Sequence, residues 1–459
     1  MRWVITSAAL AILTHFSWAA QATWRAGVAK VSITPDKSLW LTGYGSRNQP
    51  STGVINELYV KVLALEDGGG KPIVLVCADV LGFPGDVGQR IAERVRQEWG
   101  LRRDRILLNS SHTHCGPSIA HPGQMLYGPR ATDDQRRDVE QYTASLETKV
   151  VAAVAQAMAA REPAKLRFGH ARANFGMNRR LKTDRGFVIG ENPAGPVDHD
   201  VPLLIVESPG GKTRAIVFGY ACHNTTIGGD VYQFCGDYSG FAAEELEKSR
   251  EGTVAMFVQG CGGDINPSPR GTVDLARQHG KTLADAVEAA IGSTNVMTGG
   301  PVRSAYETVP IGFAASPTRQ ELTRQLDHKD IYFQWQAKEL LKVIDREGKL
   351  PAHHAYPIQV WQFGKDLTLI ALAGEVVVDY SIRLKSELGA DRTWVAGYCN
   401  DVFAYIPSRR VLEEGGYEAA GAMVYYVQPG PFVPTVEETI VAKVRELVNK
   451  AQGDDGSKP

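Results

Sequence analysis

The sequence predicts an α/β protein built as one large domain of mostly buried β-sheets flanked by helices. Hydrophobic residues make up 43% of the 459 residues, which is ample for a buried core. Short apolar runs of strand length alternate with helix-favouring stretches over most of the chain. No linker or repeat interrupts residues 23–450, so we expect a single domain over that range.

Six mostly apolar runs are predicted to be β-strands. Their continuous apolar character is typical of strands that are buried on both faces, rather than on one face only. In chain order the runs cover residues 73–76, 106–108, 215–218, 254–258, 367–372 and 394–396.

Helical stretches lie between these runs. Residues 87–99 are amphipathic, residues 142–160 are rich in Ala, and residues 273–291 follow the helical period. Ser316-Pro317 supplies an N-cap and a proline at the first helical position, so we expect one helix from there towards Ile344.

The N-terminus resembles an export signal. Arg2 precedes the short apolar run 3–13, and Ala20-Gln21-Ala22 follows as a cleavage site. The run is shorter than the roughly 20 residues that span a bilayer, and no later window is apolar enough to do so. We therefore expect a signal peptide over residues 1–22, a mature chain without a transmembrane segment, and a secreted or periplasmic location. The polar segment 451–459 is expected to be a disordered tail.

Charge and cysteine content narrow the possible partners. Lys plus Arg number 50 and Asp plus Glu number 51, so a surface that binds polyanions is not indicated and nucleic acid is not an expected partner. The six cysteines contain no Cys-x-x-Cys pair, so a thiolate zinc site is not indicated. In an oxidising compartment they permit disulfides, of which Cys222–Cys235 is one possibility.

Polar clusters follow five of the predicted strands directly. In α/β sheets, catalytic and ligand-binding groups collect beyond the carboxyl ends of strands. We therefore expect the five clusters to converge on one active site. They contain His112 and His114; His223; Asp264 and Asn266; Glu375; and the segment from Tyr398 to Tyr405.

The histidines and Glu375 are candidate metal ligands. In an extended segment His112 and His114 point to the same side, which is a common beginning of a metal site. A polar loop with two hydrogen-bonded histidines is the alternative, just as Glu375 could merely cap a helix. The glycine-rich segment 260–267 lacks a Walker pattern and is either a plain tight turn or a support for Asp264 and Asn266. Together the residues indicate a zinc site of imidazoles and a carboxylate.

Several motifs resemble those of the neutral (non-lysosomal) ceramidases. The segment Asn109-Ser110-Ser111-His112-Thr113-His114-Cys115-Gly116-Pro117 resembles the family signature Asn-x-x-His-Thr-His-Ser-Gly-Pro. The resemblance spans about residues 25–430, and its other motifs are Ile33-Thr34-Pro35 with Gly43-Tyr44, Asn178-Arg179, residues 263–267, Gly374-Glu375, and Tyr405 with Tyr417.

The resemblance implies a secreted zinc amidase that cleaves the N-acyl bond of ceramide, or of a related N-acyl lipid, to a free amine and a fatty acid by zinc-activated water. It implies one zinc ion per chain, held by His112, His223, Glu375 and Tyr405. It also implies that His114, Arg179 and Tyr417 surround the reacting amide, with Asp264 and Asn266 beside them.

The sequence departs from the family pattern at several positions. Asn266 stands where the family has Ser, Arg180 replaces the Ser of the Asn-Arg-Ser motif, and Cys115 replaces the Ser of the signature. An amide side chain cannot form an acyl-enzyme, but it can hydrogen-bond a substrate or an oxyanion. Water activated by zinc needs no protein nucleophile, so we expect altered activity rather than none. The chain also ends soon after the catalytic region, and we expect it to lack the C-terminal β-sandwich domain of longer members.

Four alternatives remain open at this point. The chain could be a zinc amidohydrolase that acts on a non-lipid N-acyl substrate, or a (β/α)₈ amidohydrolase. It could be a thiol hydrolase with Cys115 as nucleophile and His114 or His223 as base. Finally, it could be a catalytically silent lipid- or glycan-binding protein on an old enzyme fold, which the loss of the motif Ser motivates.

Overall fold

The computed structural model describes residues 24–121, 126–297 and 300–453 of the chain. The predicted signal peptide, residues 1–22, and residues 454–459 of the predicted tail lie outside this part. Helix α9 (Val436–Gly453) continues past residue 450, so the predicted start of the tail at 451 differs from the structure. Its apolar face ends with the buried Ala451, and packing of this face extends the helix beyond the predicted domain boundary.

A nine-stranded mixed sheet is the larger of the two main sheets. Its strands lie in the order β13-β11-β10-β6-β1-β3-β4-β5, with β15 paired to β6. The β4/β5 and β11/β13 pairs at its two edges are parallel, whereas the pairs between them are antiparallel. The strands are β1 (Trp24–Ser32), β3 (Tyr59–Glu66), β4 (Pro72–Ala78), β5 (Ile106–Ser110), β6 (Glu162–Arg172), β10 (Asp200–Glu207), β11 (Thr213–Tyr220), β13 (Val254–Gln259) and β15 (Asn295–Val296).

A four-stranded sheet faces the larger sheet. It has the order β16 (Val302–Gly312), β17 (His353–Phe363), β18 (Leu367–Leu372) and β20 (Thr393–Ala396). All six predicted strands are confirmed, and in the described residues they form open mixed sheets rather than a closed (β/α)₈ barrel. Four small ribbons complete the strands: β2 (Gly53–Val54) with β12 (Gln233–Phe234), β7 (Gly176–Asn178) with β14 (Ile265–Pro267), β8 (Arg180–Thr183) with β9 (Gly186–Ile189), and β19 (Glu375–Val376) with β21 (Tyr405–Ile406).

The apolar runs are continuous because each strand is buried on both faces. On β3, Val60 and Val62 pack under helices, while the alternating Leu63 and Leu65 point into the core between the sheets. The side-chain period of two along a strand sends alternate residues into these two cores. Trp361 and other residues of the smaller sheet fill the same inter-sheet core.

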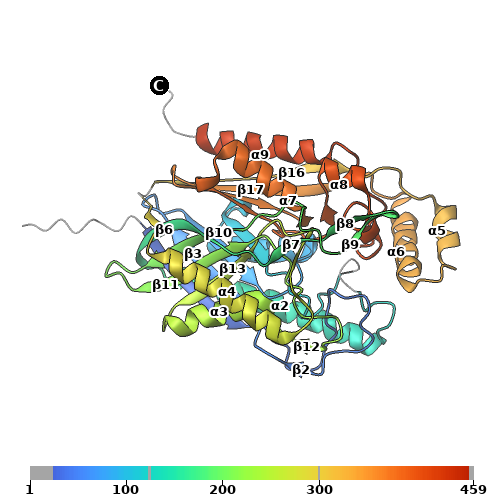
Figure 1. Cartoon of the computed structure of the whole chain (residues 1–459), viewed down its shortest axis with the longest axis horizontal. Helices are drawn as coiled ribbons and strands as arrows, with labels where there is room; N and C mark the ends of the chain where they lie inside the picture. Colours follow the sequence, from blue (N-terminus) through green and yellow to red (C-terminus); the bar gives the residue numbers. More distant parts are fainter. Residues whose placement is uncertain (1–23, 122–125, 298–299, 454–459) are drawn as a thin grey trace, which may run out of the picture.

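Helices cover the outer faces of both sheets (Figure 1). α1 (Gly85–Trp99) and α2 (Asp133–Ala159) pack over β1, β3 and β4, and α3 (Asp237–Ser249) and α4 (Val273–Ile291) pack over β10, β11 and β13. α7 (Val378–Leu388) and α9 cover the smaller sheet from the opposite side. α8 (Arg409–Glu414) follows β21.

The single helix predicted from Ser316-Pro317 to Ile344 is wrong. The structure has two helices there, α5 (Arg319–Gln325) and α6 (Ile331–Glu347). Thr318 caps the first helix through a capping box with Glu321, and the side chain of Asp330 accepts a hydrogen bond from the Tyr332 backbone and begins the second. The two cap residues each begin a helix and so divide the segment for which a single helix was predicted.

Strand ends from both edges of the large sheet meet at one place. β1 and β6 pair only over Trp24–Ala26, so the sheet is narrow at its middle. Over the seven strand-to-strand steps from β13 to β5, a rotation of roughly 20–25° per step turns the edge strands by roughly 140–175°. The pairing pattern alone would make the edge strands β13 and β5 antiparallel. The accumulated rotation turns one of them almost half a turn relative to the other, so their carboxyl ends approach each other.

The side chain of Asn109 joins these ends. Its Nδ2 donates to the Gly397 carbonyl oxygen at 2.8 Å, and its Oδ1 accepts from the Gln259 backbone N–H at 2.9 Å. Asn109 is completely buried. One amide group thus links the end of β5 to the end of β13 and to the segment after β20.

Two further features bear on the sequence-based expectations. All six cysteines are free and buried, so the structure has no Cys222–Cys235 disulfide. Among the described residues no helix combines the length and apolar character needed to cross a membrane.

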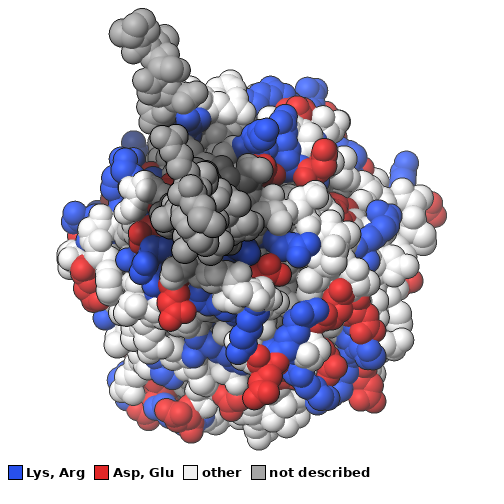
Figure 2. Space-filling model, turned by 90° about the vertical axis from the view of Figure 1, so that its left-hand side faces the viewer, with Lys and Arg blue, Asp and Glu red and all other residues white. Residues whose placement is uncertain are grey.

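Figure 2 shows basic and acidic side chains on the same face of the molecule, consistent with a net charge of −1.

Replacement of Asn109 should destabilise the fold. We expect Asn109→Ala to lower the free energy of unfolding by roughly 2–4 kcal/mol, because it removes the acceptor of the buried Gln259 N–H and one of two donors to the buried Gly397 carbonyl. Urea unfolding measures the change. Asn295→Ala, at an exposed position on β15, is the matched control and should differ little from the wild type. Equal stability of the two variants would contradict the role of Asn109.

Candidate functional site

Two histidines are held by backbone carbonyls with their Nε2 atoms turned towards the site. His112 follows β5 with a φ of 60°, and its Nδ1 lies 2.6 Å from the Leu81 carbonyl oxygen. His223 follows β11, and its Nδ1 lies 2.6 Å from the Gly262 carbonyl oxygen. A carbonyl oxygen can only accept, so Nδ1 of each ring carries a proton and donates it to the backbone, and Nε2 is the atom turned towards the site. This is the orientation in which metal-binding histidines are usually held.

The carboxylate of Glu375 faces both Nε2 atoms. Its Oε2 lies 3.1 Å from His112 Nε2 and 2.9 Å from His223 Nε2. Burial opposes ionisation of Glu375, but the two histidines hold its pKa well below the ordinary value. Burial, together with the positive charge of Arg179, lowers the pKa of His223 to about 4, so this ring is neutral near pH 7. Two imidazole nitrogens and one carboxylate oxygen thus face one another in a buried place, and this set of ligand atoms fits a divalent metal ion.

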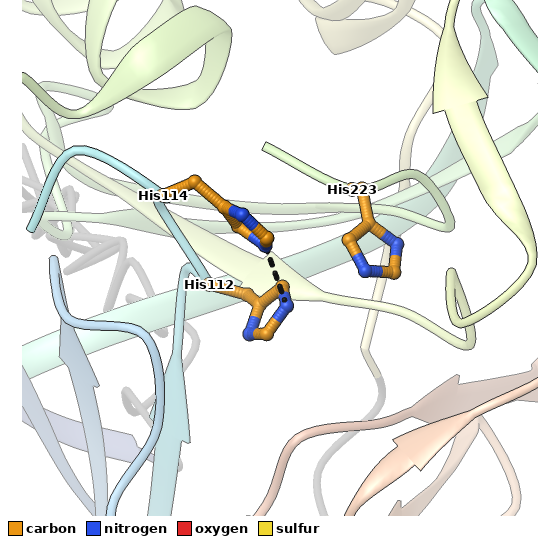
Figure 3. A group of neighbouring side chains, drawn as sticks. All are labelled: His112, His114 and His223. Atoms are coloured by element: carbon orange, nitrogen blue, oxygen red, sulfur yellow. Dashed lines mark hydrogen bonds between the residues drawn. The ribbon is translucent and has the colours of Figure 1, made fainter. Parts of the chain in front are cut away.

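His114 completes a group of three imidazoles (Figure 3). Its Nε2 lies 3.2 Å from His112 Nε2, and ligand atoms of His112, His114 and His223 all lie within 4.8 Å of one another. Burial and the two neighbouring imidazoles hold the pKa of His114 well below its ordinary value. The three imidazoles lie close enough together to hold a metal ion.

The Gly43-Tyr44 segment fixes the ring of His114. Tyr44 contacts this ring edge-on, with centroids 4.8 Å apart. Gly43 has a φ of 92°, and a Cβ at this position would lie 2.5 Å from the His114 ring. Only glycine permits this close approach of backbone and imidazole. His114 Nδ1 is buried and has no hydrogen-bond partner among the described residues.

Three tyrosines surround the Glu375 carboxylate. Tyr405, brought into register with Glu375 by the β19–β21 pair, places its hydroxyl 3.2 Å from His223 Nε2. Tyr426 donates a hydrogen bond to Glu375 Oε1, and the Tyr398 hydroxyl lies 3.5 Å from Oε2. Sequence analysis identified Tyr405 but gave Tyr398 and Tyr426 no role. Tyr398 had a detectable signal, its position after a strand, whereas Tyr426 follows a 3₁₀ turn far from any predicted strand.

Arg179 links the site to its surroundings. Its guanidinium donates to the Tyr405 hydroxyl at 3.0 Å, to Asn266 Oδ1 at 3.1 Å and to Glu418 at 2.8 Å. Glu418 also accepts from Arg180 at 2.6 Å, so one buried carboxylate neutralises two buried guanidinium groups in part. Glu418 was missed by the sequence analysis as a functional residue, although it directly follows Tyr417.

Asn266 and Asp264 differ in their distance from the site. Asn266 turns its Oδ1 to Arg179 and to the Thr225 hydroxyl, which lies 3.2 Å away. Asp264 instead accepts hydrogen bonds from the Val378 backbone at 2.8 Å and from the Asn178 amide at 3.2 Å. Its side chain thus holds the first turn of α7 and lies behind the pocket rather than in it.

A pocket of about 210 Å³ opens onto His112 and His114. Tyr417, whose ring centroid lies 5.4 Å from that of Tyr405, forms part of its wall. Arg179 and Asn266 line a second pocket of about 170 Å³, and Ile189 borders both pockets. The first pocket is lined by Gly43, Tyr44, Gly45, Leu81, His112, His114, Leu126, Ile189, Glu375, Tyr405, Tyr417, Tyr425 and Tyr426.

Cys115 does not have the environment of a nucleophile. Its thiol is buried outside both pockets, and burial raises its pKa to about 12 despite a contact with Arg47. A nucleophilic thiol needs a lowered pKa and access to the substrate. The geometry therefore argues against the thiol-hydrolase alternative.

Fold and site together define a mixed α/β protein with a buried imidazole–carboxylate centre at its strand ends. The family model described as "Neutral/alkaline non-lysosomal ceramidase, N-terminal" matches residues 24–312. The chain belongs to this family, as the sequence motifs implied. His112, His114, His223 and Asn266 lie inside the matched range, whereas Glu375 and the tyrosines lie beyond it.

Individual relatives are distant in sequence. Neutral ceramidase of Mycobacterium tuberculosis is 22% identical over an alignment of 253 residues. The alignment covers 50% of this chain and 38% of that protein. The chain thus spans less than half the length of this curated relative. The crystal structure of neutral ceramidase from Pseudomonas aeruginosa superposes with a TM-score of 0.71 at 18% identity, over 94% of this chain and 74% of that chain. A ceramidase complexed with C2 gives a TM-score of 0.71 at 17% identity, over 93% and 76% of the two chains. These structures share the fold of this chain.

The buried Asp264 should make stability depend on pH. Burial, with a contribution from the charge of Asp379, raises its pKa to about 7. The folded state holds this proton more tightly than the unfolded state, where the Asp pKa is about 3.9. Its stabilising contribution is therefore complete below about pH 4 and is lost as the pH rises through about 7. We expect the unfolding free energy of Asp264→Asn to fall less than that of the wild type over this range.

Urea unfolding at several pH values measures this difference. Asp285→Asn is the control, because the Asp285 side chain is 64% exposed and paired only with Lys281 on the surface of α4. It should keep the wild-type slope of stability against pH. A wild-type slope in Asp264→Asn would show that Asp264 is ionised in the folded protein throughout this range.

Proposed function

We propose that the protein is an exported, zinc-dependent amide hydrolase that cleaves the N-acyl bond of ceramide or a related N-acyl lipid to a free amine and a fatty acid. One observation carries the proposal: the Nε2 atoms of His112 and His223 face the buried carboxylate of Glu375, while their Nδ1 atoms are held by backbone carbonyls. A mere binding module has no need for such a costly arrangement of buried acceptors. Family membership supplies the substrate class.

The distances between donor atoms suit zinc. Neighbouring ligand atoms of a tetrahedral zinc site with bonds of 2.0–2.1 Å lie about 3.3 Å apart. His112 Nε2, His223 Nε2, Glu375 Oε2 and the Tyr405 hydroxyl approach their neighbours to 2.9–3.2 Å. We assign these four residues as the ligands of one zinc ion. When bound, zinc supplies the Lewis acidity that polarises an amide carbonyl and activates water.

The surrounding residues would carry the remaining steps. His114, neutral and 3.2 Å from a ligand nitrogen, is suited to take a proton from water and deliver it to the leaving amine. The hydroxyl of Tyr417 at the pocket wall and the guanidinium of Arg179 are suited to stabilise the oxyanion. Asn266 orients Arg179, and Asp264 supports the loop from behind. No residue at position 266 is needed as a nucleophile in this scheme.

Purified protein should contain one zinc ion per chain. We expect the double variant His112→Ala, His223→Ala to lose it, because removal of ligands eliminates most of the metal affinity. Elemental analysis measures the content. His353→Ala, an exposed histidine at the start of β17, is the control and should retain zinc. A zinc-free wild type, or unchanged zinc in the double variant, contradicts the assignment.

Substitutions around the amide should separate catalysis from metal binding. We expect His114→Ala to lower turnover by about 10²–10⁴-fold with zinc retained, and Tyr417→Phe to lower it by about 10²–10³-fold. Hydrolysis of a short-chain fluorescent ceramide and a panel of other N-acyl amides measures both. Loss of zinc in His114→Ala would make this residue a third imidazole ligand. Activity confined to non-lipid N-acyl amides would favour the non-lipid alternative.

Substitutions at Asn266 and Cys115, two positions where the family has Ser, test whether the reaction uses a protein nucleophile. Asn266→Ala should reduce the rate without abolishing it, because Asn266 only positions Arg179. Cys115→Ser should be tolerated, because its thiol lies outside both pockets. A trapped acyl-enzyme, or a zinc-loaded Cys115→Ser variant without activity, would replace the water mechanism with a thiol one.

A further inference from the structure

The β8–β9 hairpin exposes more apolar surface than its neighbours. Leu181, Val188 and Ile189 are 38%, 43% and 51% exposed, and Leu181 and Val188 are directly opposite each other in the hairpin register. β8 and β9 pair only with each other among the described strands, so the hairpin lies outside both main sheets (Figure 1). A cluster of exposed apolar side chains on one small element indicates an interaction site rather than chance.

The base of the hairpin is firmly held. Arg180 is completely buried and binds Glu418, Glu414 and the Gly415 carbonyl. Its guanidinium also lies 5.3 Å from the Phe187 ring centroid on the opposite strand. The apolar side chains of the outer part are thus presented on a fixed support.

The hairpin also borders the entrance to the site. Ile189, at the end of β9, lines both the pocket over the histidines and the pocket over Arg179. Leu181 and Val188 point from one face of the hairpin and Ile189 from the other, so the exposed apolar pair and the pocket rim belong to the two faces of one small element. If the substrate is a membrane lipid, the part of the protein that contacts the membrane is expected near this pocket entrance.

Charge at the tip favours one kind of partner. Lys182 and Arg185 are exposed beside the apolar pair, with Asp184 as the one acidic residue between Arg180 and Ile189. Apolar side chains next to cations suit the interface of an anionic bilayer, where the apolar groups enter the acyl boundary and the cations meet phosphate groups. Three apolar side chains cover much less than the roughly 800 Å² per partner of a stable protein interface.

We propose that the β8–β9 hairpin docks the protein on anionic phospholipid bilayers, with Leu181 and Val188 inserted at the boundary between headgroups and acyl chains. Docking holds the pocket rim at Ile189, the residue next to Val188, close to the membrane surface, which shortens the path of a lipid into the pocket. The proposal rests on the proposed function in one respect: only a lipid substrate gives docking a catalytic benefit. Binding itself can be measured without any substrate.

The test is co-sedimentation of the full chain with vesicles of phosphatidylcholine alone and of phosphatidylcholine with phosphatidylglycerol. We expect binding to the anionic vesicles, at least about tenfold weaker in the double variant Leu181→Ser, Val188→Ser, since each side chain loses apolar burial. Ile382→Ser is the matched control, because Ile382 is 42% exposed on α7, outside both pockets, and should bind as the wild type does. Val188→Trp should bind more tightly, because Trp favours the membrane interface.

Hydrolysis assays separate docking from catalysis. With a soluble short-chain substrate the double variant should match the wild type, whereas with substrate embedded in anionic vesicles it should be about tenfold slower. Wild type that binds neither vesicle, or a double variant that binds like the wild type, overturns the docking proposal. So does a dimer, detected by light scattering, that the double substitution dissociates. Hairpin-dependent vesicle binding without hydrolysis of any N-acyl amide leaves docking intact and refutes the proposed function.

Discussion

The buried carboxylate of Glu375 is the constraint around which the rest of the site is arranged. An isolated ionised carboxylate is expensive to remove from water, so its surroundings must supply positive charge or hydrogen bonds. Tyr426 supplies one hydrogen bond, and the two imidazoles face the other oxygen. Because each imidazole donates its Nδ1 proton to a backbone carbonyl, its Nε2 is directed at the carboxylate, where a bound cation would join the three groups.

Backbone strain is concentrated at the same place. His112, Tyr398 and Asn400 have φ values of 60°, 53° and 65°, a region that few residues other than glycine adopt; His and Asn enter it more readily than most, so Tyr398 is the least expected of the three. Gly374, directly before Glu375, has a φ of 73°, and a Cβ there would lie 2.8 Å from the Ala404 carbonyl oxygen. Strained residues persist only where the surrounding structure determines their conformation, and here that structure is the junction joined by Asn109.

Much of this arrangement could be predicted from sequence, for identifiable reasons. The strands were recognisable because burial on both faces leaves long apolar runs, and His223 and Glu375 were recognisable because each directly follows such a run. The division between α5 and α6 was missed because the cap at Asp330 was overlooked in favour of Ser316-Pro317. The division was therefore present in the sequence as a local signal.

Other parts depend on tertiary packing and leave no local signal. Tyr426 reaches Glu375 from an irregular segment whose path is set by contacts with the rest of the protein. The position of Asp264 after a strand suggested a place in the pocket, but the turn before it directs the side chain towards α7. Sequence patterns predict where a strand ends but not where the following side chains point.

The contact between Gly43 and the His114 ring has a consequence for the evolution of the family. Every L-amino acid other than glycine would put a carbon atom 2.5 Å from the ring, so position 43 can vary only if the ring moves or is replaced by a smaller group. The two positions are separated by a long stretch of sequence but are sterically a single unit. They should therefore covary among homologous sequences, with any other residue at position 43 accompanied by loss of the histidine at position 114.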